Sequence, residues 1–281
     1  MVDHMSLANN ALATQIGYAR GVRELILNGN KLPEDQTVHQ IKHFLVQLRD
    51  TGRLADSSIN IRVCGLKYYF RHVANRLDLV VKIPNPRIAK YHTEVLDAAE
   101  IKQLFNACRD TRQLLVVQLL FDSGMRIGEL LRVSLKDFDK KNRTIILRRT
   151  KGQQLRVVPY GEHIRTTLTQ YIKAIGYFPK HNLIESYKVK GQPISLRGLQ
   201  HIIRQVAKRS GIKKKITAHT LRHSYAVHFL NNGGHLPQLQ VLLGHKNIST
   251  TLHYLKYAHI PLKQVITPLD HLMINNHETK V

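Results

Sequence analysis

A break that contains two prolines divides this chain into two segments, each with its own helical pattern. Residues 83–92 read IPNPRIAKYH, and the prolines cannot continue a helix and favour extended backbone. Apolar residues recur at helical spacing on both sides of the break. With 281 residues, the chain is long enough to build a hydrophobic core in each segment. The sequence therefore predicts two domains, 1–86 and 92–281, the second with a tail from about residue 260.

The first domain is predicted to be helical. Three or four helices are expected. Three stretches place apolar residues at helical spacing, and Ser57 or Ser58 is in position to cap the third. The predicted helices are TQIGYARGVRELIL (14–27), TVHQIKHFLVQLRD (37–50) and SSINIRVCGLKYYFRHV (57–73).

The second domain is predicted to be mainly helical as well. Asp97 and Glu100 have the spacing of a capping box that opens a helix through about Cys108. The stretch TRQLLVVQLLFDSG (111–124) is typical of a buried helix that ends at its glycine, although the apolar run also fits a strand. Further helices are expected over 162–175, 195–210, 217–231, 236–243 and 248–257.

Two short stretches in this domain favour strands instead. RTIILRR (143–149) and QLRVVPY (154–160) are rich in β-branched residues and flank TKGQ, which predicts a β-hairpin. The expected fold class is therefore mainly α with a small β-hairpin or sheet (α+β): a helical first domain and an α+β second domain.

The charge of the chain indicates a polyanionic partner. It carries 43 Lys plus Arg against 19 Asp plus Glu, a net charge of +24, and thirteen of the basic residues lie between Glu185 and Asp270 without a single acid. Ordinary solvated surfaces mix both signs. The pattern favours nucleic acid over a membrane surface, and a generic basic protein such as a ribosomal component stays open on charge alone.

Membrane insertion and disulfide bonding are not expected. No apolar run approaches the roughly 18 residues of a membrane helix, and the first residues lack the apolar core of a signal peptide. The cysteines, Cys64 and Cys108, have no CxxC partner. A reducing cytoplasm is the expected compartment.

Several charged side chains have spacings that suggest chemistry. In SGMRIGEL, the spacing of Arg126 and Glu129 places them on one helix face. Such a pair is usually an ordinary surface ion pair. Here it directly follows a run that is predicted to be buried, and a guanidinium in that setting indicates a function. Lys151 lies at the tip of the predicted hairpin, where its amine could reach a ligand or simply occupy a turn. His219 and Arg222 also share a helix face.

Two other functions compete for the histidines and for the last helices. His219 and His223 are spaced to grip zinc, but no carboxylate near them supplies a third ligand. The segment LPQLQVLLGHKNISTTLHYLKYA has two short predicted helices around Gly244, the size of a helix-turn-helix that simply reads DNA. It also carries His245 and Tyr254.

In their order along the chain, these residues closely resemble the catalytic signature of the tyrosine recombinases, the phage integrase family. The resemblance covers roughly residues 95–257, whereas the first ninety residues resemble the core-binding domain of that family only in size and class. The matching motifs are SGMRIGEL, TKGQ, HTLRHSYA, LLGH and STTLHYL, with Arg126, Glu129, Lys151, His219, Arg222, His245 and Tyr254.

The resemblance implies a DNA strand transferase. Tyr254 is expected to attack a phosphodiester and to leave a 3′-phosphotyrosyl link and a free 5′-hydroxyl, with Tyr257 as the alternative nucleophile. Arg126 and Arg222 are expected to hold the nonbridging oxygens, without a metal or other cofactor. Lys151 is expected to be the general acid.

Supporting roles follow from the same resemblance. His219 is expected to help with the phenolic proton or bind the phosphate, and His245 to hydrogen-bond the phosphate. Glu129 is expected to orient Arg126 and His219. No catalytic role is expected for the remaining histidines of this helix, His223 and His228.

The implied partner is double-stranded DNA with inverted-repeat core sites, bound by a homotetramer that is a monomer or weak oligomer when free. The resemblance is also compatible with accessory proteins that bend the DNA. The expected location is the cytoplasm, in association with the nucleoid. The tail IPLKQVITPLDHLMI either docks on the neighbouring protomer or folds back on its own domain. The expected outcome is integration, excision or resolution of a mobile element. The alternatives are a non-catalytic DNA-binding regulator and an enzyme similar to a type IB topoisomerase.

Overall fold

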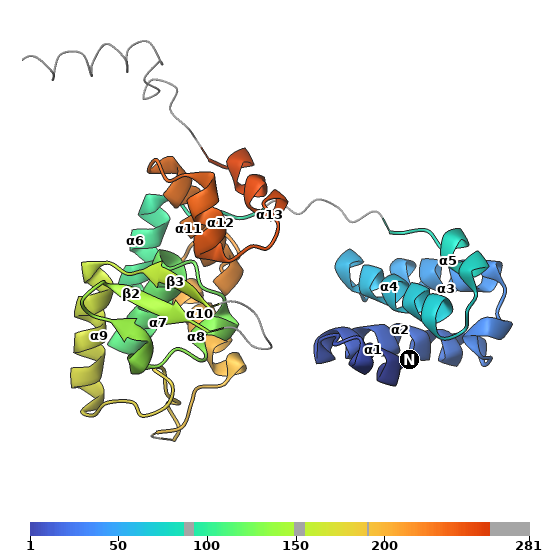
Figure 1. Cartoon of the computed structure of the whole chain (residues 1–281), viewed down its shortest axis with the longest axis horizontal. Helices are drawn as coiled ribbons and strands as arrows, with labels where there is room; N and C mark the ends of the chain where they lie inside the picture. Colours follow the sequence, from blue (N-terminus) through green and yellow to red (C-terminus); the bar gives the residue numbers. More distant parts are fainter. Residues whose placement is uncertain (87–92, 149–154, 190, 259–281) are drawn as a thin grey trace, which may run out of the picture. The chain divides into compact units, whose positions relative to one another are not determined.

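The chain forms two compact units, Met1–His92 and Thr93–Val281, in a computed structural model (Figure 1). The structure describes residues 1–86, 93–148, 155–189 and 191–258.

The first unit is a small helical bundle. The predicted helices are confirmed, because α2, α3 and α4 cover the three stretches with apolar residues at helical spacing. The two six-residue helices that precede and follow them were not predicted, since six residues are too short for a periodic pattern. The elements are α1 (Val2–Leu7), α2 (Leu12–Gly29), the 3-10 helix η1 (Pro33–Asp35), α3 (Val38–Asp50), α4 (Asp56–His72) and α5 (Leu77–Lys82).

Close contact between α2 and α4 organises this unit. A Cβ atom on Gly65 of α4 would lie 2.6 Å from the Cα atom of Tyr18 on α2, so glycine is required where the two backbones meet. The predicted cap at Ser57 or Ser58 is wrong. The helix α4 already begins at Asp56 with Ala55 at its N-cap, which provides no side-chain hydrogen bond.

The second unit contains all the predicted helices of that domain and a sheet. The elements are α6 (Ala98–Asn106), α7 (Thr111–Asp122), α8 (Ile127–Leu130), the 3-10 helix η2 (Leu135–Asp137), β1 (Phe138–Asp139), β2 (Thr144–Leu147), β3 (Arg156–Pro159), α9 (Glu162–Ile175), α10 (Leu196–Ser210), α11 (Ala218–Asn231), α12 (Leu236–Leu243), α13 (Ser249–Leu252) and the 3-10 helix η3 (His253–Lys256).

The predicted hairpin is confirmed as an antiparallel pair, β2 and β3, with Ile145 opposite Val158. The residues that join the two strands, TKGQ, lie outside the described part of the chain. The unpredicted strand β1 pairs with β2 and gives the sheet order β1-β2-β3. It is only two residues long, so no alternation marks it in the sequence.

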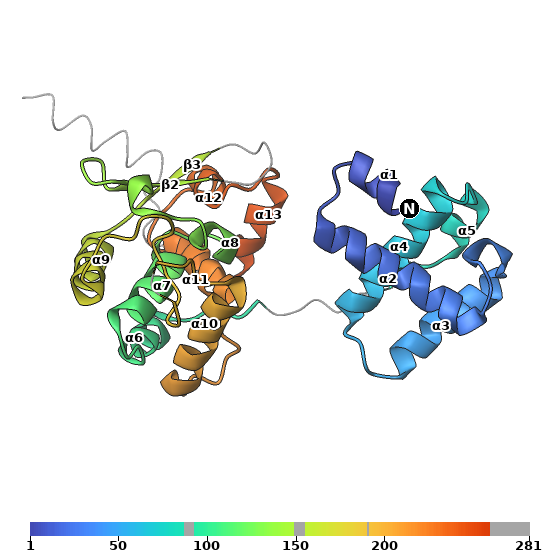
Figure 2. The ribbon, with the colours of Figure 1, turned by 90° about the horizontal axis from the view of Figure 1, so that it is seen from below.

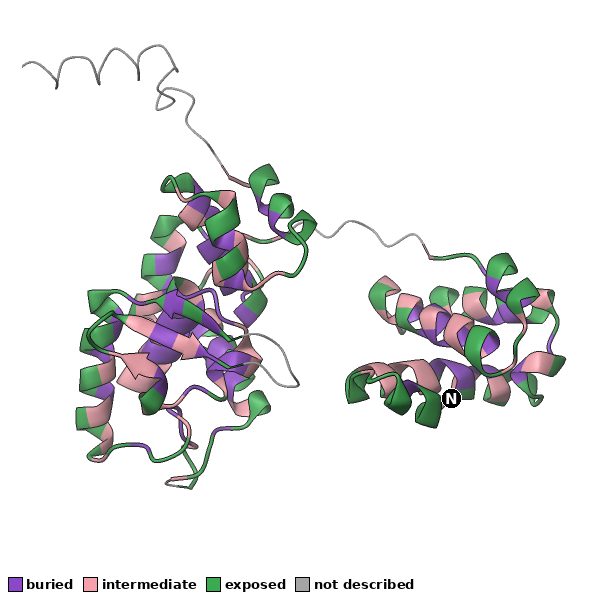
Figure 3. Ribbon diagram, in the orientation of Figure 1, coloured by how far each residue is buried: buried purple, intermediate pink, exposed green. Residues whose placement is uncertain are grey.

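The helix α7 forms the centre of the second core. The helical interpretation of this apolar stretch is confirmed: Asp110 caps the helix by accepting a hydrogen bond of 2.7 Å from the backbone N–H of Gln113. The helix packs among α6, α9, α10 and α11 (Figure 2). Its leucines and valines from Leu115 onward are almost completely buried, as are the inward residues of β2 and β3 (Figure 3).

Contact between α7 and α11 brings together segments that lie about a hundred residues apart in the sequence. The helices α12 and α13 and the 3-10 helix η3 then continue this layer along α11. They form a smaller apolar cluster that includes Tyr225, Leu239, Leu243 and Tyr254. The end of α7 and the motifs of α11, α12 and η3 are therefore neighbours.

Candidate active site

A tight turn after α7 connects two of the motifs. Gly124 has a φ of +57°, and a Cβ atom there would lie 2.7 Å from Cε1 of Tyr225. Only glycine accepts both this backbone conformation and this close contact. The carbonyl of Gly124 accepts a hydrogen bond of 2.5 Å from Nη1 of Arg222. The Ser-Gly turn thus holds a guanidinium from α11.

Arg126 and Glu129 lie on one face at the start of α8. The backbone N–H of Arg126 donates to Oε2 of Glu129 over 2.7 Å, and its guanidinium lies 3.4 Å from Oε1. The side chain of Arg126 is 40% exposed, whereas that of Glu129 is 6% exposed. The guanidinium of Arg126 also donates to the carbonyl of Leu243 over 3.4 Å. The arginine is therefore accessible to a ligand, whereas the carboxylate is buried.

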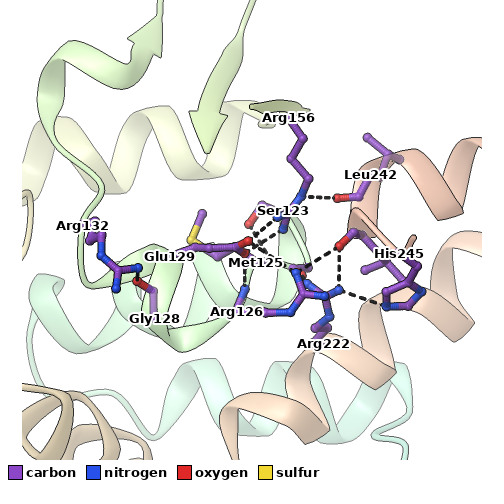
Figure 4. Close-up of polar contacts among 12 residues, drawn as sticks. Ser123, Met125, Arg126, Gly128, Glu129, Arg132, Arg156, Arg222, Leu242 and His245 are labelled. Atoms are coloured by element: carbon purple, nitrogen blue, oxygen red, sulfur yellow. Dashed lines mark hydrogen bonds and ion pairs between the residues drawn. The ribbon is translucent and has the colours of Figure 1, made fainter. Parts of the chain in front are cut away.

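A second arginine, Arg156 on β3, binds the same carboxylate, and the sequence analysis missed it. Its Nη2 donates to Oε2 of Glu129 over 2.8 Å, its Nη1 donates to Oε1, and its Nε donates to the carbonyl of Leu242 over 2.7 Å (Figure 4). Alternation along β3 places Arg156 and Val158 on the inward face, so this signal was present in the sequence.

The fixed arginines keep Glu129 ionised. Burial raises the pKa of a carboxyl group, but the hydrogen bonds and charges of Arg156 and Arg126 outweigh it and lower the pKa of Glu129. A buried carboxylate with this pairing orients the guanidinium groups on both of its sides.

Arg222 is buried, and its hydrogen-bond partners among the described residues are main-chain carbonyls and a histidine rather than a carboxylate. Besides Gly124, its Nη2 donates to the carbonyl of Leu243 over 2.7 Å and lies 3.1 Å from Nε2 of His245. Burial, together with the positive charges of Arg126 and Arg156, lowers the pKa of Arg222 to about 9. It stays cationic at neutral pH, in a region with excess positive charge that attracts an anion.

The contacts of His245 define which of its nitrogens carries the proton. A guanidinium only donates, so Nε2 of His245 accepts from Arg222. Its Nδ1 then donates to Oγ1 of Thr251 over 2.9 Å, and Thr251 is completely buried. Thr251 therefore fixes the ring of His245, a role that no sequence signal indicated.

Tyr254 lies beside this cluster. It belongs to η3, is 3% exposed, and its ring lies parallel to that of His245 with centroids 6.2 Å apart. Burial raises the pKa of Tyr254, while the charges of Arg222 and Arg126 act in the opposite direction. A phenol beside two guanidinium groups is an arrangement that can attack a bound phosphate.

Comparison with known proteins agrees with this geometry. The phage integrase family profile matches residues 94–259, and the profile of the N-terminal SAM-like domain of phage integrases matches residues 1–77. The chain belongs to the phage integrase family. It is thus a tyrosine recombinase, as the sequence resemblance implied.

Named relatives are similar over most of the chain. Tyrosine recombinase XerA of Thermococcus kodakarensis is 30% identical over 79% of this chain and 78% of its own length. Tyrosine recombinase XerC of Staphylococcus epidermidis is 32% identical over 66% of this chain and 64% of its own length.

Solved structures share the fold. A lambda integrase dimer bound to a COC′ core site matches with a TM-score of 0.75 and 20% identity, over 90% of this chain and 92% of that one. The Tn1549 transposon integrase in complex with transposon right end DNA matches with a TM-score of 0.71 and 20% identity, over 98% and 97%.

Three further residues were predicted to take part in the reaction: His219, Lys151 and, as the alternative nucleophile, Tyr257. His219 is an exposed residue in the first turn of α11, where partial desolvation of its ring and the charges of Arg222 and Arg126 lower its pKa. Lys151 lies outside the described residues. The hydroxyl of Tyr257 accepts a 3.4 Å hydrogen bond from the backbone N–H of Thr93.

The two histidines without a predicted role also have defined contacts. His228 bonds the carbonyl of Leu96 through Nε2 at 2.8 Å. Nδ1 of His223 lies 3.0 Å from the hydroxyl of Tyr254.

Within the described ranges, no three His, Cys, Asp or Glu side chains are grouped to hold a metal ion. No helix in those ranges has the length and hydropathy to span a bilayer.

Proposed function

We propose that this recombinase cuts and rejoins DNA strands at specific sites through a 3′-phosphotyrosyl intermediate on Tyr254. One observation carries the proposal: Tyr254 lies within hydrogen-bonding reach of Arg222 and in the electrostatic field of Arg126, and both arginines bond the carbonyl of Leu243. Membership of the tyrosine recombinases supports the same activity.

In the proposed reaction, Arg126 and Arg222 bind the nonbridging oxygens of the scissile phosphate and stabilise the charge of the transition state. Oη of Tyr254 forms a bond to phosphorus as the bond to the 5′ oxygen breaks, and Lys151 gives its proton to that oxygen. The guanidinium groups supply the positive charge, so the scheme needs no metal ion or organic cofactor.

The remaining residues would support this step. We propose that His219 helps with the phenolic proton or binds the phosphate. We also propose that His245 hydrogen-bonds the phosphate, for which its Nε2 must be protonated and donate to the phosphate instead of accepting from Arg222. Glu129 would hold Arg126 in place through the two contacts described above. The covalent link conserves the energy of the phosphodiester, so the strands can be rejoined without ATP.

A suicide substrate tests the proposed activity. Wild-type protein is incubated with a duplex that carries the inverted repeats flanking the gene and a nick beside the cleavage position, so that the released fragment diffuses away. We expect a protein–DNA species that survives denaturing electrophoresis and is destroyed by protease. Retardation on a native gel without this species would instead support a DNA-binding regulator.

Assembly on DNA is part of the proposal. The partner would be double-stranded DNA with inverted-repeat core sites, in the cytoplasm, and the outcome integration, excision or resolution of a mobile element. Exposed basic side chains on α10, such as Arg197, Arg204 and Lys208, support a polyanionic partner. Four copies would act on two synapsed sites, with free protein as a monomer or weak oligomer.

An apolar groove in the second unit suggests how neighbouring copies connect. It has a volume of about 650 Å³ and is lined by residues of α6, α7 and α11, among them Ile101, Phe105, Phe121 and Phe229. The predicted tail, 260–281, lies outside the described residues and contains the apolar sequence IPLKQVITPLDHLMI. We propose that this tail occupies the groove of the neighbouring protomer.

Deletion of residues 260–281 tests the role of the tail. We expect the truncated protein to bind a single site but to lose the synaptic complex and strand exchange, because the apolar contact between copies is gone. Sedimentation of the DNA complexes measures the assembly, and a two-site exchange assay measures the product. Unchanged assembly and exchange would show that the tail does not connect protomers.

A further inference from the structure

The hydroxyl of Tyr254 has a specific partner, His223, which has no role in the reaction proposed above. Nδ1 of His223 lies 3.0 Å from Oη of Tyr254, within hydrogen-bond distance. The two rings have centroids 5.5 Å apart. His223 follows Arg222 on α11, so one helix presents the guanidinium and the imidazole to the same tyrosine.

The surroundings of His223 keep its imidazole neutral. Burial, with the nearby His219, Arg222 and His253, lowers its pKa to about 4. The groups that face it are Arg222 and His219 on its own helix and Tyr254 and His253 on η3. None of these is a carboxylate. A neutral imidazole has one ring nitrogen that can accept a proton.

The phenol needs such an acceptor. Burial raises the pKa of Tyr254, so at neutral pH the hydroxyl keeps its proton until the reaction begins. Burial and the nearby His219, Arg222 and His253 make His223 a poor base in the free protein. A DNA phosphate bound at Arg222 would offset part of that positive charge and so raise the basicity of His223.

We propose that His223 is a further catalytic residue, the group that receives the proton of Tyr254 during strand cleavage. The inference rests on the proposed function, and it leaves His219 the second of its two proposed roles, binding the phosphate. As the Oη–phosphorus bond forms and the phosphorus–O5′ bond breaks, the phenolic proton moves to Nδ1 of His223, and the leaving oxygen receives a separate proton from the general acid. In rejoining, the incoming 5′-hydroxyl attacks phosphorus and gives its proton back to the general acid, while the bond from phosphorus to Oη breaks and the imidazolium of His223 returns its proton to Oη.

His223→Asn separates proton transfer from hydrogen bonding. The amide of asparagine occupies the place of Nδ1 and still bonds the tyrosine hydroxyl, but it does not accept a proton. His253→Asn is the matched control, because His253 also lies beside Tyr254 but bonds Oγ1 of Thr93 at 3.2 Å. Both variants are compared with wild type for thermal unfolding, for affinity to the target duplex, and for the single-turnover rate of covalent adduct formation on the nicked substrate.

We expect His223→Asn to form the adduct about 10²- to 10⁴-fold more slowly than wild type, the range for loss of a general base, with unchanged DNA affinity. His253→Asn should stay within about threefold of the wild-type rate, as expected where no proton transfer is lost. A substrate with sulfur in place of the 5′ oxygen that departs needs no general acid. On this substrate, adduct formation by His223→Asn should still be slow.

A rate of adduct formation by His223→Asn within about threefold of wild type would overturn the inference. So would full recovery of that rate on the sulfur substrate, because His223 would then protonate the leaving oxygen rather than accept the proton of Tyr254. If His223→Asn unfolds at a lower temperature, His223→Gln serves as the second variant under the same criteria. A wild-type protein that forms no adduct would refute the proposed function itself, so the two failures are distinguishable.

Discussion

Replacement of Tyr254 by phenylalanine is expected to abolish the covalent protein–DNA species. The change removes one oxygen atom, the proposed nucleophile, from a ring that is 3% exposed and packs against Leu239 and Leu243 in the apolar cluster. The ring itself stays, so we expect folding to persist and DNA affinity to change by less than about threefold, or about 0.7 kcal/mol. Denaturing electrophoresis of the nicked-substrate reaction measures the adduct, and native gel retardation measures affinity.

Tyr257→Phe is the matched control. Tyr257 follows one helical turn later, and its hydroxyl bonds the backbone of Thr93. This variant should form the adduct at close to the wild-type rate. If the adduct survives in Tyr254→Phe and disappears in Tyr257→Phe, the nucleophile has been assigned to the wrong tyrosine.

The second large effect is expected for Arg156→Met. This change removes the two hydrogen bonds from Arg156 to Glu129 and leaves a buried carboxylate with fewer partners. Loss of one partner of a buried ion pair typically costs about 3–5 kcal/mol in the free energy of unfolding. Glu129 also loses its fixed position, so Arg126 and the adduct rate should be affected as well. Urea denaturation measures the first effect and the nicked-substrate assay the second.

Arg143→Met provides the control for charge removal. Arg143 lies 3.6 Å from Glu162, and both side chains are more than half exposed. An exposed pair of this kind contributes at most about 1 kcal/mol. Equal losses of stability in Arg143→Met and Arg156→Met would contradict the assignment of Arg156 as the residue that holds Glu129.

The stability difference between wild type and Arg156→Met should depend on pH. The pKa of Glu129 is lowered in the folded protein from its ordinary value of 4.5, so its ionised form contributes stability above that value and loses it as the pH falls through the folded pKa. We therefore expect the difference to be largest at neutral pH and smaller in acid. A difference that grows as the pH falls would exclude Glu129 as the source.

Local patterns were sufficient to predict most of the elements. The capping box of Asp97 and Glu100 involves residues three apart, and the structure confirms it with a 2.8 Å bond. The wrong cap on α4 has a local cause too. Serine is a good N-cap, but the chain becomes helical just before the two serines, so Ser57 and Ser58 lie inside the first turn.

The site was predictable only as a set of residues. The order and spacing of the motifs identified Arg126, Arg222 and Tyr254 as candidates, and the structure places them together. Arg156 gave a weaker signal, a charged residue on the inward side of an alternating strand. Nothing local indicated its target, because Glu129 lies 27 residues away on a different element.

The sequence by itself determined the helical periodicity, the hairpin, the positive charge and the series of motifs that defines the family. Only the tertiary structure decided that Arg156 holds Glu129, that Thr251 fixes His245, and that His223 contacts Tyr254. The physical reason is that periodicity and capping depend on neighbours within one helical turn or along one strand, whereas these contacts depend on how separate elements pack against one another.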